Sequence, residues 1–172
     1  MLYQVIDNFL DDVSFLAIKN DIYGGNFPWF KSDGVVIEQA QAGIDPTWCW
    51  QLYHMFYCFS APYSGKFSIL EPLINKLNPS AIMKIKGNLV PRADKIIEHG
   101  LHIDIPGFKG KTAVYYINSN NGFTVFDDGS KVESLANRMV IFDSTIKHTG
   151  TTCTDAANRC VINFNYYEWN FE

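Results

Sequence analysis

The hydrophobic and polar positions of the first eighty residues recur mainly at helical spacing. Asp11 or Asp12 can cap the N-terminus of a helix that ends before Gly24. A second, amphipathic helix is predicted over residues 66–77, where apolar side chains recur every three or four positions, and it stops near Pro79.

Two segments between these helices have a less regular pattern. Residues 47–60 are rich in aromatic side chains, and their spacing favours a buried helix over a strand. Residues 24–43 are predicted to form a loop that carries Trp29 and Phe30. Such a loop is either a lid over a site or a segment that its buried aromatic rings hold in place.

After Pro79 the pattern changes to an alternation with period two, which is typical of strands. The strands expected from this alternation span residues 83–90, 111–118, 138–142 and 159–166. The Asn-Asn-Gly of residues 120–122 and the Asp-Asp-Gly of residues 127–129 are turn signals between strands. The second half of the chain therefore predicts short antiparallel strands.

Helices followed by antiparallel strands predict an α+β protein in which the N-terminal helices pack on one sheet. The expected core is a jelly roll, or double-stranded β-helix. One domain is expected over residues 1–172, with a helical part over about 1–80 and the jelly-roll core over about 81–168.

Composition excludes several classes of protein. The chain is 47% hydrophobic and 19% charged, which is typical of a globular protein and not of a disordered one. No apolar run is long enough to span a bilayer, and the start lacks the pattern of a signal peptide, so a cytoplasmic protein with four reduced cysteines is expected. The net charge of −4 disfavours duplex nucleic acid as a partner and leaves a short single strand open.

Three side chains suggest a metal site. His102 and Asp104 are two positions apart, so on an extended chain both point the same way. His148 follows in the strand region, where an antiparallel neighbour can bring it to the same place. Two histidines and one carboxylate are the ligands of the facial triad that holds non-haem Fe(II) with open positions. The alternative is a chance pairing of structural residues, since an isolated histidine is more often structural than a ligand.

An arginine opens the last predicted strand, eleven residues after His148. Arg159, Asn163 and Asn165 share one face of that strand, while Cys160 and the alternate residues that follow it are hydrophobic and share the other. The hydrophobic face is expected to pack under the helices. The polar face is expected to line a wet interior, where Arg159 can anchor a carboxylate that reaches the metal.

Several segments together resemble a known enzyme family. They are residues 95–104, 112–118, 121–126, 148–150 and 159–166, and the resemblance covers about residues 82–167 together with the start of the chain at 5–10. In these segments the chain resembles the prolyl-hydroxylase-like group of Fe(II)- and 2-oxoglutarate-dependent oxygenases, which includes small phage-encoded and bacterial enzymes.

The resemblance implies roles for individual residues. The triad of His102, Asp104 and His148 would ligate Fe(II), and 2-oxoglutarate and O₂ would take the open positions. Arg159 would pair with the distal carboxylate of 2-oxoglutarate, and the hydroxyl of Tyr115 would contact the same carboxylate.

Asn163 matches a small polar residue that often lines the cosubstrate pocket of this group. Val90 departs from the group, because tyrosine is common at its position and one expected hydroxyl is therefore absent. The gap between the second histidine and the arginine is also slightly longer than in some relatives.

Other polar residues allow two interpretations each. Asn88 shares a face with Lys84 and Lys86, and if this face is the interior, Asn88 touches cosubstrate or substrate while the lysines lie at the far, solvated end. Arg92 is either a substrate ligand or, more commonly, a solvated arginine. His99 is either a neighbour of the metal site or, more commonly, a surface or loop histidine.

The leading interpretation is an Fe(II)- and 2-oxoglutarate-dependent oxygenase, and specifically a hydroxylase. It would couple the activation of O₂ to the conversion of 2-oxoglutarate to succinate and would act on a peptide, amino acid or small molecule. Two alternatives remain: a cupin-like metal enzyme that does not use 2-oxoglutarate, and a non-catalytic jelly-roll binding module in which the triad is coincidental.

Overall fold

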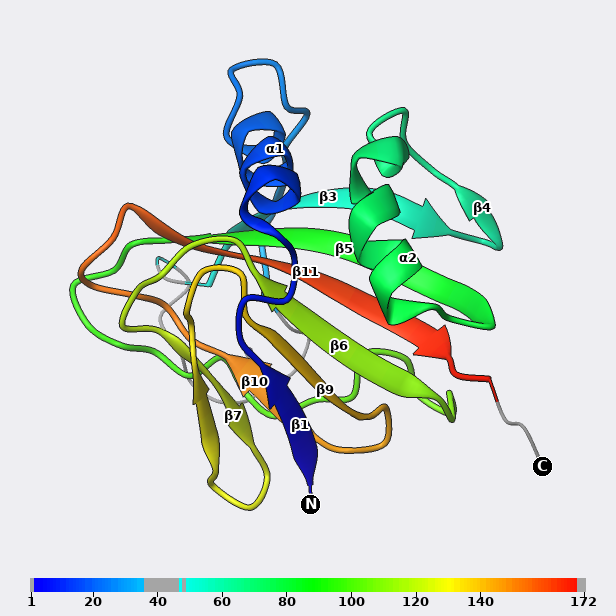
Figure 1. Cartoon of the computed structure of the whole chain (residues 1–172). Helices are drawn as coiled ribbons and strands as arrows, with labels where there is room; N and C mark the ends of the chain where they lie inside the picture. The colour runs from blue at the N-terminus through cyan, green and yellow to red at the C-terminus, as the bar shows by residue number, and fades with distance from the viewer. Residues whose placement is uncertain (1, 36–46, 48, 170–172) are drawn as a thin grey trace.

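The computed structural model describes residues 2–35, 47 and 49–169, and its elements alternate between helices and strands in the first half of the chain (Figure 1). The helices are α1 (Asp12–Ile22) and α2 (Glu71–Leu77), and a 3₁₀ turn (Phe67–Leu70) precedes α2. The strands are β1 (Tyr3–Ile6), β2 (Phe30–Ser32), β3 (Gln51–Cys58), β4 (Ala61–Pro62), β5 (Ala81–Pro91), β6 (Lys111–Tyr116), β7 (Phe123–Phe126), β8 (Lys131–Glu133), β9 (Met139–Asp143), β10 (His148–Gly150) and β11 (Asn158–Tyr167).

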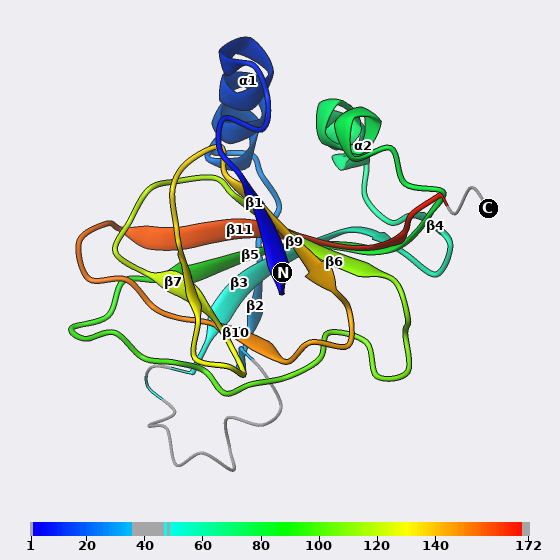
Figure 2. The ribbon, with the colours of Figure 1, turned by 60° about the horizontal axis from the view of Figure 1, so that its bottom comes forward.

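The strands form two antiparallel sheets. The large sheet has the order β1-β9-β6-β11-β5-β3-β2, with β4 paired to β3, and the small sheet has the order β10-β7-β8. Single bridges from His102 to His148 and from Glu98 to Thr151 place the segment before β6 beside β10. The small sheet lies across one face of the large sheet (Figure 2), and this arrangement is the double-stranded β-helix that the sequence predicts.

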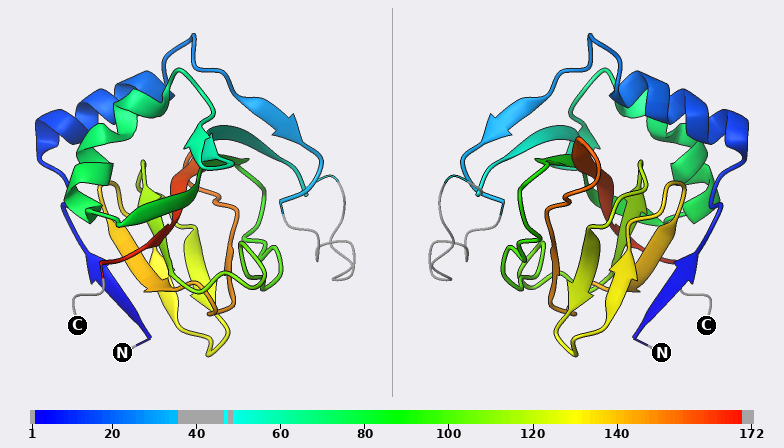
Figure 3. Two further views of the ribbon diagram at one scale, coloured as in Figure 1. Left: turned by 90° about the vertical axis from the view of Figure 1, so that its right-hand side faces the viewer. Right: turned by 90° about the vertical axis from the view of Figure 1, so that its left-hand side faces the viewer.

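Both helices lie on the other face of the large sheet (Figure 3). Asp11 caps α1 by accepting a hydrogen bond from the backbone N–H of Ser14 at 3.0 Å, as the sequence predicts. The largest hydrophobic cluster joins buried residues of the two helices and the 3₁₀ turn to the outward side chains of β11, namely Phe15, Ile18, Ile22, Leu70, Leu73, Cys160, Ile162, Phe164 and Tyr166. The hydrophobic face of β11 therefore packs under the helices, as expected.

The prediction of a helix over 47–60 is wrong, because this segment contains β3. Residues Leu52, His54 and Phe56 face the helices, while Tyr53 and Met55 are half-buried on the opposite face. Aromatic residues occur on both faces of β3, so the period of two is hidden in the sequence. The expected division into a helical part before residue 80 and a strand core after it differs from the structure, because β1, β2, β3 and β4 all lie before residue 80.

The loop expected over 24–43 lies only partly within the described residues, which end at Val35 and resume at Thr47. In the described part, the indole of Trp29 donates to the carbonyl of Ile22 at 3.3 Å and lies against Gly87, where an added Cβ would be 3.4 Å from the ring. Trp29 is thus held by packing, while 54% of Phe30 is exposed. The role of this loop as a lid stays a prediction, as does the single domain.

No disulfide joins any two of the four described cysteines, and their reduced state stays a prediction. In the part of the chain that the structure describes, neither helix has the length and apolar character that crossing a membrane would require.

Asn137 connects the N-terminal segment to the large sheet. Its side-chain oxygen accepts hydrogen bonds from the Leu10 N–H at 2.9 Å and the Tyr115 hydroxyl at 2.7 Å, and its amide donates to the Leu10 carbonyl at 2.8 Å. The residue is buried and has a φ of 62°, which asparagine tolerates better than most residues.

We expect Asn137→Ala to lower the free energy of unfolding by about 2–4 kcal/mol, because it leaves buried partners unsatisfied and places an alanine in the left-handed region. Chemical denaturation would measure the change. Asn75→Ala, at an exposed position of α2, is the control and should change stability by less than about 0.5 kcal/mol. Equal effects of the two substitutions would contradict this account of Asn137.

Candidate metal centre and cosubstrate pocket

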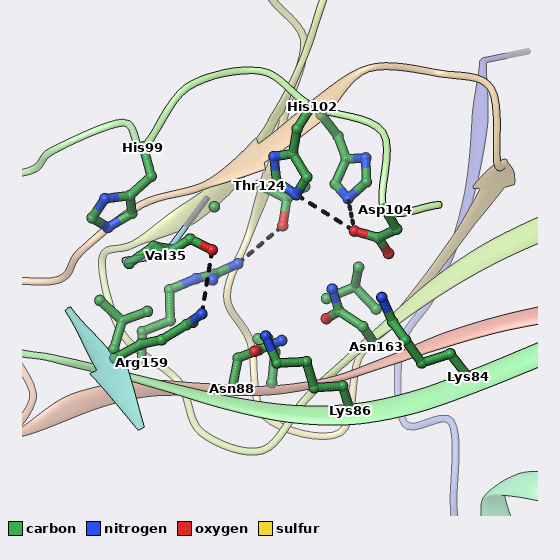
Figure 4. A pocket seen from close by; sticks show the side chains of 16 residues that line it. Val35, Lys84, Lys86, Asn88, His99, His102, Asp104, Thr124, Arg159 and Asn163 are labelled. Carbon is green, nitrogen blue, oxygen red and sulfur yellow. Dashed lines mark hydrogen bonds and ion pairs between the residues drawn. The ribbon is translucent and has the colours of Figure 1, made fainter. Parts of the chain in front are cut away.

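A cavity of about 90 Å³ lies between the two sheets, and it contains most of the polar residues that the sequence singles out (Figure 4). Its walls come from the inward face of β5 and β11, from β7 and β10 of the small sheet, and from the segment before β6. The lining residues include Lys84, Lys86, Asn88, Val90, His99, His102, Asp104, Thr124, His148, Gly150, Arg159 and Asn163.

The backbone brings the two histidines of the triad together. His102 and His148 are partners in an antiparallel bridge, in which each backbone N–H donates to the carbonyl of the other at 3.0 Å. Asp104 follows two residues later, after the bridge, and its carboxylate turns back toward both rings (Figure 4). The triad is thus assembled by one backbone bridge between β10 and the segment before β6, together with a bend of the chain at Asp104.

The imidazole Nε2 atoms of both histidines face the carboxylate. Asp104 Oδ1 lies 3.4 Å from His102 Nε2 and 3.6 Å from His148 Nε2. The Nδ1 atoms lie 3.2 and 3.3 Å from the carbonyls of Gly100 and Ile146, which can only accept a hydrogen bond. Nδ1 therefore carries the hydrogen in each ring, and Nε2 presents a lone pair to the site.

Lone pairs and a carboxylate that face one another need a cation between them. One ligand atom from each residue can be chosen so that all three lie within 4.8 Å of one another. Two ligands about 2.1 Å from a metal are roughly 3 Å apart at a right angle and about 4 Å apart when opposite, and the two distances from Asp104 Oδ1 lie between these limits. His148 Nε2 is buried without a hydrogen-bond partner among the described residues. The residues therefore fit a divalent metal such as Fe(II).

The protonation states also suit a metal. Burial lowers the pKa of His148, which favours the neutral imidazole that a metal needs. Burial acts to raise the pKa of Asp104, but the positive charge that a proton on His102 or His148 supplies, together with the charge of Lys84, outweighs burial and holds this pKa well below its usual range. A divalent metal would supply the same positive charge when both imidazoles are neutral. Asp104 is consequently an anion.

Asn165 fixes the second oxygen of Asp104. Its side-chain amide donates at 3.0 Å to Asp104 Oδ2 and at 3.0 Å to the hydroxyl of Thr112 on the neighbouring strand β6. Asp104 Oδ1 then remains directed at the histidines. The sequence places Asn165 on the inward face of β11 but does not reveal this contact, since Asp104 lies in a loop.

Arg159 is a buried cation at the other end of the cavity, with 3% of its surface exposed. Its Nε donates to the Ser134 hydroxyl at 2.8 Å and its Nη2 to the Thr124 hydroxyl at 3.0 Å. Among the described residues, no carboxylate forms an ion pair with it. Its Cζ also lies 5.5 Å from the centre of the Tyr116 ring. A buried guanidinium whose neighbours are hydroxyls and an aromatic ring is suited to bind an anionic ligand.

Two glycines leave space for this arginine. A Cβ on Gly150 would lie 2.8 Å from Arg159 Nη1, and a Cβ on Gly122 would lie 2.8 Å from its Cδ. Both contacts are shorter than packed atoms allow, so larger residues at either position would displace the guanidinium.

The expected role of Tyr115 is wrong. Its side chain lies on the helix face of β6, where it packs against Phe9 and Phe15 and donates to Asn137. Its neighbour Tyr116 has the opposite orientation. The two faces of β6 are equally buried and hydrophobic, so the sequence does not show which tyrosine faces inward.

Thr124 places a hydroxyl beside Arg159 in the cavity. Its oxygen accepts from the Tyr116 hydroxyl at 2.7 Å and from Arg159 Nη2, so its own hydrogen is available to an acceptor in the cavity. Val90 lies opposite Arg159 in the β5–β11 pairing and lines the cavity without a polar group. Sequence reasoning missed Thr124 and Ser134, because their partner Arg159 is at least 25 residues away.

The remaining polar candidates divide into two groups. Asn88 and Asn163 line the cavity, and the side-chain oxygen of each is buried without a hydrogen-bond partner among the described residues. Their roles toward a ligand stay predictions. Arg92 is exposed and does not belong to the lining, which favours the solvated interpretation.

Two expectations about this region are wrong. His99 is fully buried and lines the cavity, so it is not a surface histidine, and burial together with the charges of Arg159 and His102 lowers its pKa to about 4. Lys84 and Lys86 also line the cavity instead of lying beyond it. The sequence pattern gives the face of a strand but not how far along the strand the cavity extends.

No protein-family model and no curated protein matches this sequence. The fold does match solved structures. The viral collagen prolyl hydroxylase of Paramecium bursaria Chlorella virus-1, in its 2-oxoglutarate complex, is 12% identical and has a TM-score of 0.60, covering 95% of this chain and 94% of its own.

Two further structures show the range of this fold. An oxidoreductase of the 2OG-Fe(II) oxygenase family from Burkholderia pseudomallei is 11% identical over 98% of this chain and 86% of its own, with a TM-score of 0.66. The α-ketoglutarate-dependent epimerase SnoN from nogalamycin biosynthesis is 13% identical over 97% and 78%, with a TM-score of 0.63. At these identities the likeness shows that the fold is the one such oxygenases use.

We expect Asn165→Ala to weaken Fe(II) binding about 10- to 100-fold, because it releases the carboxylate that Asn165 holds. Anaerobic Fe(II) titration would measure the change. Asn163→Ala, at the next inward position of β11, is the matched control and should leave the metal affinity unchanged. Identical affinities of the Asn165 variant and the wild type would show that Asp104 needs no such support.

Proposed function

We propose that this protein is an Fe(II)- and 2-oxoglutarate-dependent oxygenase. The observation that carries this proposal is the placement of two complementary sites in one cavity: a His-Asp-His set with metal-ligand spacing, and a buried arginine that has no acidic partner among the described residues. A dicarboxylate that chelates the metal at one end and meets the guanidinium at the other would satisfy both.

The proposal assigns a role to each polar residue of the site. His102, Asp104 and His148 hold Fe(II), and Arg159 with the Thr124 hydroxyl binds the distal carboxylate of 2-oxoglutarate. Bound Fe(II) supplies the centre at which O₂ is activated. Asn88 and Asn163 lie on the inward face between the two ends, where their buried side-chain oxygens can accept hydrogen bonds from a ligand.

The proposed reaction is a hydroxylation. One substrate C–H bond, O₂ and 2-oxoglutarate give a C–OH group, succinate and CO₂, and the substrate is a peptide, an amino acid or another small molecule. Prolyl hydroxylases among the similar structures support this outcome, while the epimerase SnoN shows that the fold also serves other oxidations. A cupin-like enzyme is disfavoured, because such sites more often carry three histidines and a glutamate.

Anaerobic addition of Fe(II) and then 2-oxoglutarate tests the proposal. We expect the weak visible charge-transfer band of the chelate, with one metal per chain, followed in air by the formation of succinate. Metal binding without the charge-transfer band, and without succinate formation for any substrate offered, would contradict the proposal. Failure to bind stoichiometric divalent metal would instead favour a non-catalytic binding module.

Arg159→Ala should weaken 2-oxoglutarate binding roughly 10- to 150-fold, the equivalent of a charge-assisted hydrogen bond of about 1.5–3 kcal/mol. The midpoint of the charge-transfer titration measures this change, and metal affinity without cosubstrate should stay the same. Arg92→Ala is the control, since Arg92 is exposed and outside the cavity lining.

A second pair of variants tests which face of β6 meets the cosubstrate. Thr124→Val should weaken 2-oxoglutarate binding, because it removes the hydroxyl between Arg159 and the ligand. Tyr115→Phe should leave this affinity unchanged and lower stability by about 1 kcal/mol through the lost hydrogen bond to Asn137. The reverse result would support the contact between Tyr115 and the distal carboxylate that the family resemblance implies.

A further inference from the structure

Two lysines project from β5 into the cavity beside the metal centre (Figure 4). In the β5–β11 pairing, Lys84 lies opposite Asn165, which holds the Asp104 carboxylate, and Lys86 lies opposite Asn163. Both lysines therefore stand on the inward face, on the part of β5 nearest the metal ligands. An inward strand position is costly for a charge, so two of them side by side need a reason.

Neither lysine forms an ion pair with a described residue. The Nζ of Lys86 instead lies 5.3 Å from the centre of the Tyr53 ring. Burial, and then the positive charge of Lys84, lower the pKa of Lys86, whereas the charge of Asp104 acts to raise it. The two ammonium groups thus repel one another within the cavity wall.

The proposed metal and cosubstrate would not neutralise these lysines. The charges of Fe(II) and Arg159 are balanced by Asp104 together with the two carboxylates of 2-oxoglutarate, provided that the histidines are neutral. Asp104 is the sole carboxylate among the residues found to line the cavity. Two positive charges therefore remain beside the metal after the cosubstrate is bound.

We infer that the substrate carries a carboxylate or phosphate group, which Lys84 and Lys86 bind next to the metal. This inference rests on the proposed function and narrows its substrate class. The neighbouring β3 side chains are apolar in part, since Met55 lies opposite Lys86 and Tyr53 opposite Asn88. Tyr53 and Met55 line a neighbouring hollow that also includes Lys84. This hollow would take the carbon skeleton of the substrate, while the anionic group sets its orientation.

Matched pairs of probes test this inference on protein loaded anaerobically with Fe(II) and 2-oxoglutarate. The pairs are L-aspartate with L-asparagine, L-glutamate with L-glutamine, and O-phospho-L-serine with L-serine. Calorimetric titration should show that at least one acid binds tenfold or more tightly than its neutral partner. The amino acid pairs and the phosphoserine pair distinguish a carboxylate from a phosphate.

Substitutions of the two lysines test whether Lys84 and Lys86 cause the preference for the acidic probe. Lys84→Met with Lys86→Met should abolish the preference for the acid, whereas Lys84→Arg with Lys86→Arg should retain most of it. Lys76→Met, at an exposed position of α2, is the control and should retain all of it. Thermal unfolding of each variant shows whether the protein is folded.

The charge-transfer band in the same samples separates this inference from the proposed function. A band with equal binding within every probe pair, including no binding by either member, would overturn the inference alone. Acid preference that persists in the double methionine variant would also overturn it. Absence of the band in the wild type would overturn the proposed function and, with it, the inference.

Discussion

β11 is hydrogen-bonded to β5 on one side and to β6 on the other. It separates the hydrophobic core under the helices from the polar cavity between the sheets. Its outward residues are packed under α1 and α2 in the main hydrophobic cluster. Its inward residues, from Arg159 to Asn165, form the floor of the cavity. A shift of one residue in the pairing would exchange the two faces, so this register decides both the core and the site.

The cavity contains polar atoms whose hydrogen-bonding capacity the described residues do not satisfy. Side-chain oxygens of Asn88 and Asn163 and the Nε2 of His148 are buried without hydrogen-bond partners among the described residues, and Arg159 forms no ion pair with any of them. Each such group carries a cost in free energy that a metal and an anion would offset. Binding and stability should therefore be linked in this protein.

Part of this arrangement could be predicted from local pattern. The cap at Asp11, the second helix and the alternation of β11 follow from residue spacing, because a helix and a strand repeat their faces with fixed periods. The bridge between His102 and His148 agrees with the expectation that an antiparallel neighbour brings the second histidine to the first.

Other parts could not be predicted. β3 has aromatic residues on both faces and gives no clear period, and β6 is buried on both sides, so Tyr115 and Tyr116 are equivalent in the sequence although they point in opposite directions. The contacts from Asn165 to Asp104 and from Arg159 to Thr124 and Ser134 join residues far apart in the chain.

The sequence by itself determined the chemical groups, their order and the faces of the strands with a polar side. Only the tertiary structure decided which side chains share the cavity and which way a strand buried on both faces is turned. The physical reason is that hydrophobic and polar residues alternate along a strand only when one of its faces is buried and the other is exposed to water or lines a polar cavity. Where both faces of a strand are buried, the difference disappears, and only pairing with the neighbouring strands sets the orientation.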